Sequence, residues 1–168
     1  EGSVFLRGAL RAAAIGATGD YLERAAELLR VGADALVIDI AHGHSRVMER
    51  AMLGVRARFG DVPLVAGNVA TAEGVAFLLN LGADAIKVGI GPGGGCTTRL
   101  ATNFGVPQVE ALVRCHEAAA GKVPLIADGG VKRDGALVQA LLFGGATVML
   151  GSAFAGTLET PGETVLKP

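Results

Sequence analysis

The sequence contains no tryptophan, one tyrosine and six phenylalanines, so aromatic residues make up only 4% of its 168 positions. Hydrophobic residues nevertheless reach 51% and charged residues 18%. This balance excludes intrinsic disorder as the main state, because enough apolar surface is present to build a core. With so few aromatic rings, we expect that core to be packed from Ala, Leu, Val and Ile side chains.

An excess of charge of either sign is also absent. Fifteen basic and sixteen acidic residues leave a formal net charge of -1, and no basic cluster stands out. This balance argues against a nucleic acid or an anionic membrane surface as the partner. A small-molecule partner is therefore the better expectation.

Long hydrophobic runs are missing as well. The least charged stretch, residues 140–156, is shorter than the roughly 20 apolar residues of a membrane span and is interrupted by three glycines. The first residues, Glu1-Gly2-Ser3, show neither the charged nor the apolar region of a secretory signal. We expect a protein without a membrane segment.

Cysteine is scarce, and the two cysteines lie far apart, which argues against a disulfide framework and predicts a reducing, cytoplasmic setting. Cys115 falls within an apolar helical pattern and is interpreted as core filler. Cys96 instead lies between glycines and Thr97-Thr98. Backbone N–H groups can approach a ligand closely in such a loop and can lower a thiol pKa, so Cys96 is the candidate nucleophile.

Short apolar runs alternate with segments of helical periodicity along the whole chain. The predicted strands are 10–15, 35–39, 64–66, 85–88, 125–127 and 147–150, and the predicted helices are 21–31, 46–59, 72–81, 109–120 and 134–143. Strict alternation predicts parallel strands joined by right-handed crossovers. Because the strands are apolar on both faces, we expect helices to cover the sheet.

Polar residues gather just after at least five predicted strands, namely at 39–45, 67–68, 89–99, 128–130 and 151–152. A doubly wound sheet usually carries its glycine fingerprint at one turn, whereas a barrel spreads functional groups over many strand ends. We therefore predict the α/β class and a parallel (β/α)8 TIM barrel, with about six strands present. Since a barrel typically needs roughly 250 residues, residues 1–168 are expected to be one barrel domain that is incomplete at both ends.

Two neighbouring strand ends favour a nucleotide or sugar-phosphate ligand. Asp128-Gly129-Gly130 follows one predicted strand, and Gly151-Ser152 follows the next. A carboxylate beside free N–H groups suits ribose hydroxyls next to a phosphate, and phosphate sites recur after the last two strands of barrels. Each motif alone could also be an ordinary strand-to-helix turn.

Other strand ends carry candidates of lower specificity. Asp39 can accept hydrogen bonds from a ribose diol. His42 and His44 invite a metal interpretation, but no third ligand at suitable spacing follows, and Ser45 can simply cap the next helix. Asn68 and Lys87 occupy corresponding strand-end positions, where ligand contact and structural support both stay open.

Five groups of residues together carry a family resemblance. They are 39–45, 66–71, 87–93 with 96–99, 127–130, and 149–152 with 154–157 and 161–163. In this order and register, the sequence resembles the inosine monophosphate (IMP) dehydrogenase and guanosine monophosphate (GMP) reductase family. The likeness spans nearly the whole chain.

The resemblance implies a covalent oxidation. The Cys96 thiolate would attack C2 of IMP, a hydride would pass to NAD, and water would hydrolyse the resulting thioimidate to xanthosine monophosphate, with Thr98 as a polar catalytic partner. The implied substrate residues are Gly94, Asp128, Gly129, Gly130, Gly151 and Ser152. The implied cofactor residues are Asp39, Asn68, Gly89, Ile90 and Gly91. Carbonyls of Gly91, Gly93 and Cys96 would bind a monovalent cation such as K+, and the assembly would be a homotetramer.

The sequence departs from the family pattern in two places. Gly94-Gly95 stands where the family commonly has Ser followed by an apolar residue, which removes a hydroxyl that would contact phosphate. The chain also stops at Leu166-Lys167-Pro168, before the flap that carries the water-activating arginine. We therefore expect the fragment to be inactive alone. Residues 10–16 resemble the point where the barrel resumes after a regulatory insertion, and no regulatory domain is expected within this chain.

Residues 41–45, 70–74 and 151–152 favour the dehydrogenase over the reductase, which would deaminate GMP to IMP with NADPH. Two other functions stay open. One is a non-catalytic nucleotide-binding barrel in which Gly94-Gly95 marks a degraded loop. The other is a sugar-phosphate aldolase or isomerase, for which Lys87 is the available strand lysine.

Overall fold

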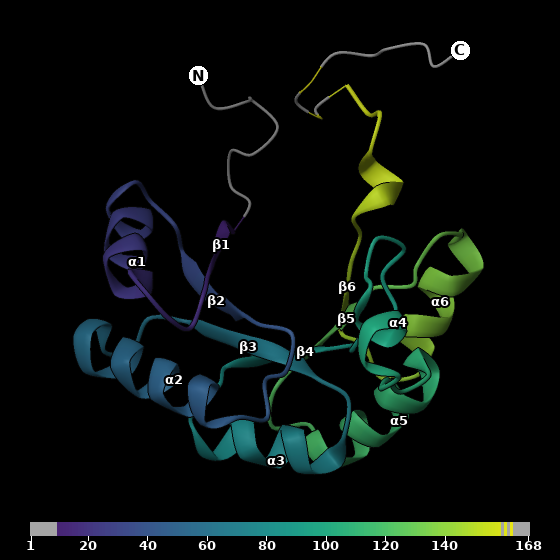
Figure 1. Cartoon of the computed structure of the whole chain (residues 1–168), viewed down its shortest axis with the longest axis horizontal. Helices are drawn as coiled ribbons and strands as arrows, with labels where there is room; N and C mark the ends of the chain where they lie inside the picture. The colour runs from purple at the N-terminus through teal and green to yellow at the C-terminus, as the bar shows by residue number, and fades with distance from the viewer. Residues whose placement is uncertain (1–9, 159, 161, 163–168) are drawn as a thin grey trace.

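The computed structural model describes residues 10–158, 160 and 162, so residues 1–3, 161, 163 and 166–168, which were singled out above, lie outside the described residues. The elements in chain order are β1 (Ala12–Ile15), α1 (Tyr21–Arg30), β2 (Ala35–Asp39), α2 (Arg46–Phe59), β3 (Leu64–Val69), α3 (Ala72–Asn80), β4 (Ala85–Val88), α4 (Thr98–Thr102), α5 (Gln108–Ala119), β5 (Leu125–Asp128), α6 (Asp134–Leu142), β6 (Thr147–Met149) and the 3-10 helix η2 (Ser152–Phe154) (Figure 1).

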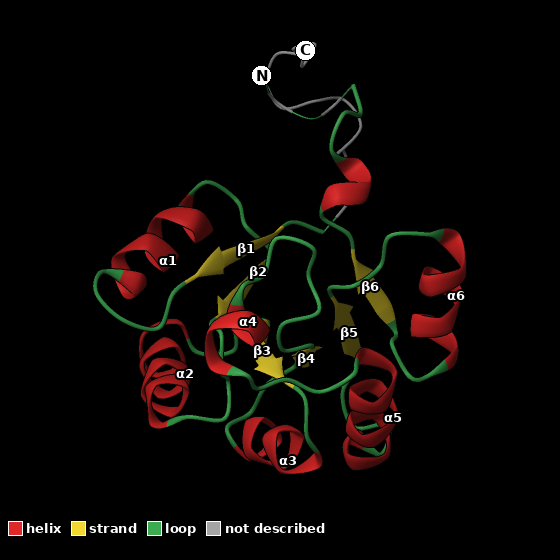
Figure 2. Cartoon of the chain, turned by 45° about the vertical axis from the view of Figure 1, so that its right-hand side comes forward, coloured by secondary structure: helices red, strands yellow, loops and turns green. Residues whose placement is uncertain are grey.

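One parallel sheet holds all six of these strands in the sequential order β1-β2-β3-β4-β5-β6. Crossovers of the same hand between strands in sequential order place the longer helices on one face of the sheet. Figure 2 shows this arrangement, with α1, α2, α3, α5 and α6 outside a curved sheet. A doubly wound sheet would reverse its order and carry helices on both faces. The predicted (β/α) barrel class with six strands is therefore confirmed.

The core lies between the outer helices and the sheet. Leu36, Ile38 and Ile86 of the strands are fully buried, as are Met48 and Met52 of α2. Among the described residues, the buried hydrophobic cluster contains no aromatic side chain. The prediction of an aliphatic core is thus confirmed, and the described phenylalanine and tyrosine rings pack around it or lie at the surface.

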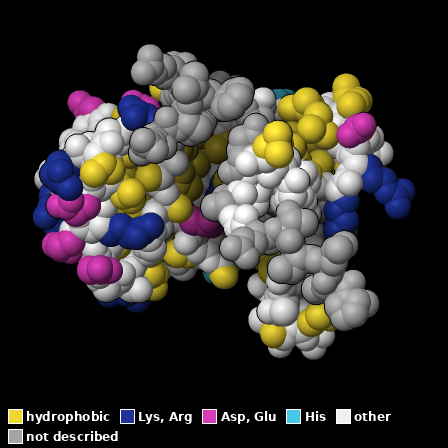
Figure 3. Space-filling view, turned by 90° about the horizontal axis from the view of Figure 1, so that it is seen from above, with side chains coloured by type: hydrophobic (Ala, Val, Ile, Leu, Met, Phe, Trp, Pro, Cys, Tyr) yellow, Lys and Arg dark blue, Asp and Glu magenta, His cyan; other side chains and the backbone are white. Residues whose placement is uncertain are grey.

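The edges of the sheet are less covered than its centre. Of the described strands, β6 pairs with β5 alone. Leu141, Leu142 and Phe143 at the end of α6 and Met149 of β6 are exposed. Seen from above, hydrophobic side chains are visible on both the left and the right parts of the molecule (Figure 3). In the part of the chain that the structure describes, no helix is long and apolar enough to span a membrane.

Element boundaries differ from the predicted ones by a few residues. β1 begins at Ala12 rather than at residue 10, and β3 continues to Val69 instead of ending at residue 66. Gly67 and Asn68 were predicted to follow the strand, but both belong to β3, which shows a register shift against β4 between Gly67 and Val69. The short helix α4 was not predicted, because five threonine-rich residues have weak helix propensity. The hydroxyl of Thr102 donates to the Thr98 carbonyl at 2.7 Å within it.

Candidate functional site

Of the cavities at the carboxyl ends of the strands, two contain the residues predicted for the cofactor and for the substrate. The first, of about 360 Å³, is the cysteine cavity, and it is lined by Asp39, Ile40, Ala41, Asn68, Gly89, Ile90, Gly91, Cys96 and Thr98. The second, of about 330 Å³, is the glycine cavity, and it is lined by Gly93, Gly94, Gly95, Asp128, Gly129, Gly130, Val131, Lys132, Met149, Gly151 and Ser152. The structure therefore brings the five predicted cofactor residues together with Cys96 and Thr98, and it brings the six predicted substrate residues together next to them.

The Cys96 thiol is exposed and has a polar partner two residues away. It donates to the Thr98 hydroxyl at 3.3 Å. The pKa of Cys96 lies below its ordinary value, first because the Thr98 side chain hydrogen-bonds the sulfur, then because the Thr98 backbone N–H does, with the positive charge of Arg99 contributing. Hydrogen bonds that favour the thiolate make the sulfur a better nucleophile near neutral pH.

Arg99 anchors the loop that carries Cys96. Its Nε donates to the Ile90 carbonyl at 3.3 Å, and its Nη2 donates to the Val106 carbonyl at 2.5 Å. These contacts join α4 to the strand end before it and to the segment after it. Sequence reasoning assigned Arg99 no role, because only the fold shows which carbonyls lie within its reach.

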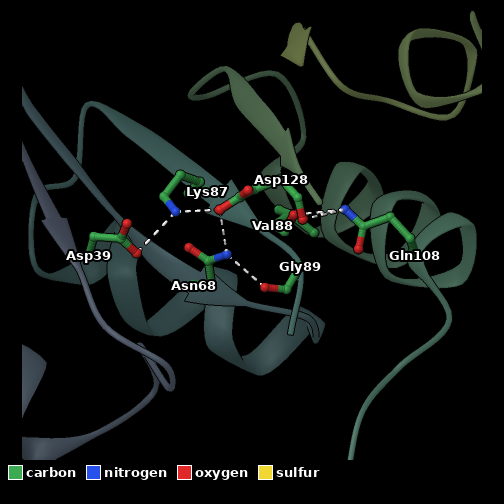
Figure 4. Close-up of polar contacts among 7 residues, drawn as sticks. All are labelled: Asp39, Asn68, Lys87, Val88, Gly89, Gln108 and Asp128. Atoms are coloured by element: carbon green, nitrogen blue, oxygen red, sulfur yellow. Dashed lines mark hydrogen bonds and ion pairs between the residues drawn. The ribbon is translucent and has the colours of Figure 1, made fainter. Parts of the chain in front are cut away.

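A polar network lies between the two cavities (Figure 4). Lys87 Nζ donates to Asp39 Oδ1 at 3.0 Å and also to Asp128 Oδ2. Asn68 Nδ2 donates to Asp128 Oδ2 at 2.9 Å and to the Gly89 carbonyl at 2.6 Å. The carboxylates of two strand ends are thereby tied to the strands between them. Lys87 therefore contacts both carboxylates directly, whereas the sequence left open whether it contacts a ligand or supports the structure.

Lys132 is a further residue of the glycine cavity that sequence reasoning missed. Its side chain lies against Gly94, where a Cβ would be 3.3 Å from Lys132 Cε and 3.6 Å from Nζ. The position that lacks the family's hydroxyl is thus next to an ammonium group. Lys132 follows the Gly129-Gly130 pair by two positions, but the sequence does not show which loop its side chain contacts.

The remaining candidate residues, Ser45, His44 and Cys115, make contacts that support the fold. Ser45 accepts a hydrogen bond from the Met48 N–H at 3.3 Å, which confirms the predicted cap of α2. The His44 ring packs on Phe77 with centroids 4.8 Å apart. Within the described residues, no group of three or more His, Cys, Asp or Glu side chains could hold a metal ion. Cys115 is fully buried, and burial raises its pKa to about 12, which confirms its interpretation as core filler.

Alkylation by iodoacetamide should distinguish the two cysteines and test the Thr98 contact. Only the thiolate reacts, so a lowered pKa gives Cys96 a larger reactive fraction at neutral pH, while Cys115 stays protonated and buried. Replacing Thr98 with Val removes the hydroxyl, and we expect the pH midpoint of alkylation to move upward. Thr97→Val is the matched control, since the Thr97 side chain makes no capping hydrogen bond. Equal pH midpoints of alkylation in Thr98→Val and Thr97→Val would contradict the role of the Thr98 hydroxyl in lowering the Cys96 pKa.

Comparison with known proteins agrees with this geometry. The family model of the IMP dehydrogenase / GMP reductase domain matches residues 7–168. The inosine-5'-monophosphate dehydrogenase of Streptococcus pyogenes is 54% identical over 160 residues, which cover 92% of this chain and 32% of that protein. The enzyme of the same name from Aquifex aeolicus is 48% identical over 154 residues, 91% of this chain and 31% of that protein. The chain thus spans about a third of the length of these relatives.

Solved structures of high similarity include two of GMP reductase from Trypanosoma brucei. One has a TM-score of 0.87 and 43% identity, covering 90% of this chain and 35% of that chain. The other, in complex with guanosine monophosphate, has a TM-score of 0.89 and 42% identity, covering 93% and 33% respectively.

Proposed function

The chain belongs to the family of IMP dehydrogenase and GMP reductase domains, and we propose that the protein carrying it oxidises IMP to xanthosine monophosphate with NAD as the acceptor. The observation that carries this proposal is the exposed Cys96, whose pKa is lowered by Thr98, at the boundary of two adjoining cavities. Relatives named inosine-5'-monophosphate dehydrogenase at 46–54% identity support the dehydrogenase over the reductase.

In the proposed reaction, the Cys96 thiol first loses its proton, and the Thr98 hydroxyl, which accepts from the thiol, would then donate to the thiolate. The thiolate forms a bond to C2 of the purine. The hydrogen on C2 then leaves with its electron pair, and NAD supplies the acceptor for this hydride. Water adds to C2 and gives up a proton, the C2–S bond breaks with its electron pair on sulfur, and the thiolate leaves and can take up a proton. Splitting the oxidation into these two stages is the general advantage of a covalent intermediate.

The residues of the cysteine cavity fit a nicotinamide cofactor. Asn68 is only 9% exposed, and its Oδ1 has no hydrogen-bond partner. A buried acceptor without a donor costs free energy, and the amide N–H of a carboxamide would satisfy it. Asp39 lines the same cavity, and its half-exposed carboxylate can accept from a ribose diol. We place the cofactor here, with Gly89, Ile90 and Gly91 beside it.

The glycine cavity suits the nucleotide, with Asp128 accepting from the ribose and the glycines and Ser152 near the phosphate. Here Lys132 would supply the charge that replaces the missing hydroxyl at Gly94. We expect Lys132→Met to raise the KM for IMP by about tenfold or more, because a charge-assisted hydrogen bond to phosphate is lost. The kcat/KM for inosine, which has no phosphate, should stay unchanged.

Arg133→Met is the matched control for this prediction, since Arg133 is the neighbouring exposed basic residue and does not line the cavity. Steady-state kinetics with IMP and with inosine, measured for both variants, test whether Lys132 contacts the phosphate. A loss of the same size with inosine would show that Lys132 acts on the fold of the loop rather than on the phosphate.

A monovalent cation at the carbonyls of Gly91, Gly93 and Cys96 belongs to the same proposal. The Gly93 carbonyl already accepts from the Cys96 N–H at 3.1 Å, which leaves it one lone pair for an ion. We further propose that residues 1–168 form part of a catalytic barrel domain, in a cytoplasmic homotetramer. Replacement of K+ by a larger organic cation in the assay, and light scattering, test the ion and the assembly.

The deciding experiment uses the full-length protein with two substrate pairs. NADH formation from IMP and NAD establishes the dehydrogenase. Loss of NADPH in the presence of GMP establishes the reductase, which the likeness to GMP reductase structures at 42–43% identity makes the second candidate. Neither activity, together with nucleotide binding, would favour a barrel that binds without catalysis.

A further inference from the structure

Lys87 is a buried charged side chain for which the proposed reaction has no use. It lies on β4 and is only 1% exposed. Its ammonium group contacts a carboxylate of β2, Asp39, and a carboxylate of β5, Asp128. Desolvation of an ammonium group is costly unless it is paired, so a lysine in this position requires its partners.

The path of the Lys87 side chain depends on a glycine. Asp39, Gly67 and Lys87 occupy one row of the sheet, since Asp39 pairs with Gly67 and Gly67 with Lys87. A Cβ at Gly67 would lie 2.6 Å from the Lys87 Cβ and 2.8 Å from its carbonyl oxygen. The absent side chain therefore leaves the space in which Lys87 reaches across β3 to Asp39.

The two carboxylates belong to different cavities. Asp39 lines the cysteine cavity, and Asp128 lines the glycine cavity, whereas Lys87 lines neither. One ammonium group thus lies between both cavities and is shared by one acceptor of each, as Figure 4 shows. Asn68 adds a second link, because it lines the cysteine cavity and donates to Asp128.

We propose that Lys87 is a positioning residue that couples the cofactor cavity to the nucleotide cavity. It holds Asp128 in place for the ribose of the nucleotide and holds Asp39 in place for the cofactor. A substitution at Asp39 should therefore change the affinity for the nucleotide, because it alters the position of Lys87. This inference rests on the proposed function, since it takes IMP as the ligand of the glycine cavity.

The test uses full-length protein, IMP as the probe and no NAD. The readout is the IMP concentration that halves the rate of Cys96 alkylation by iodoacetamide. We expect Lys87→Met to raise this concentration by about tenfold, because Asp128 loses its charged hydrogen-bond partner. Lys87→Arg, which keeps a cation, should recover part of the loss. Lys122→Met is the matched control, because Lys122 is an exposed lysine that lines neither cavity, and it should leave protection unchanged.

Asp39→Ala provides the decisive variant, because this half-exposed side chain does not line the glycine cavity. In the protein that retains Lys87, we expect Asp39→Ala to raise the IMP concentration that halves Cys96 alkylation severalfold. In the Lys87→Met background, we expect Asp39→Ala to have no further effect. Equal effects in both backgrounds, or no effect of Asp39→Ala in the Lys87 protein, would overturn the coupling. Should Lys87→Met fail to fold, the absence of any effect of Asp39→Ala in the protein that retains Lys87 would still overturn the coupling, and Lys87→Arg then serves as the second background. If IMP does not protect Cys96 from alkylation even in the unmodified protein, the result would instead contradict the proposed function.

Discussion

Cys96→Ser should form no measurable NADH from IMP in the full-length enzyme. A serine hydroxyl at this position has no thiolate to offer, and the Thr98 contacts that lower the Cys96 pKa cannot make an alkoxide near neutral pH. Losing a nucleophile of this kind lowers kcat by about 10³-fold or more. Steady-state NADH formation, followed by absorbance, measures the effect.

Two measurements make this result specific. Cys115→Ala removes the other thiol, which is fully buried and donates weakly to the Thr71 carbonyl at 3.7 Å, and activity should persist. Equilibrium binding of IMP to Cys96→Ser should also persist, because the glycine cavity is unchanged. Substantial turnover by Cys96→Ser would refute the covalent mechanism while leaving the family assignment intact.

Gly89→Ala should be the most destabilising single change at the site. Gly89 has φ of 143°, a conformation that L side chains rarely adopt. An added Cβ would lie 2.1 Å from the Asp128 carbonyl oxygen and 3.0 Å from Gln108 Nε2. Because the nearest atom is backbone, β4 and β5 must separate to accommodate it. We expect the free energy of unfolding to fall by about 3 kcal/mol or more, since strain and overpacking act together.

The measurement is the midpoint of urea unfolding of the full-length protein, followed by circular dichroism. Gly135→Ala is the matched control, since a Cβ there meets nothing within 4 Å and Gly135 lies within α6. Alanine favours a helix interior over glycine, so the control should be neutral or stabilising by up to about 1 kcal/mol. Similar midpoints for Gly89→Ala and the unmodified protein would mean that the two strand ends separate easily.

The sequence by itself determined the features that depend on local pattern. Alternating apolar runs and helical periodicity located the six strands and the five longer helices, because side-chain spacing directly reflects the backbone period. Glycines around Cys96, and Asp128 directly before two glycines, indicated the candidate site residues, whose chemistry stays a proposal. Ser45 was recognised as a cap, since capping involves residues only a few positions apart.

Only the tertiary structure decided which distant residues meet. Asp39, Lys87 and Asp128 are 41 to 48 positions from their partners, and nothing in their local sequence states that one ammonium group lies between two carboxylates. The approach of Lys132 to Gly94 and the anchoring of the Cys96 loop by Arg99 likewise depend on which strand ends are neighbours. Strand order and register set those neighbours, and they follow from packing of the whole sheet against its helices rather than from any one segment.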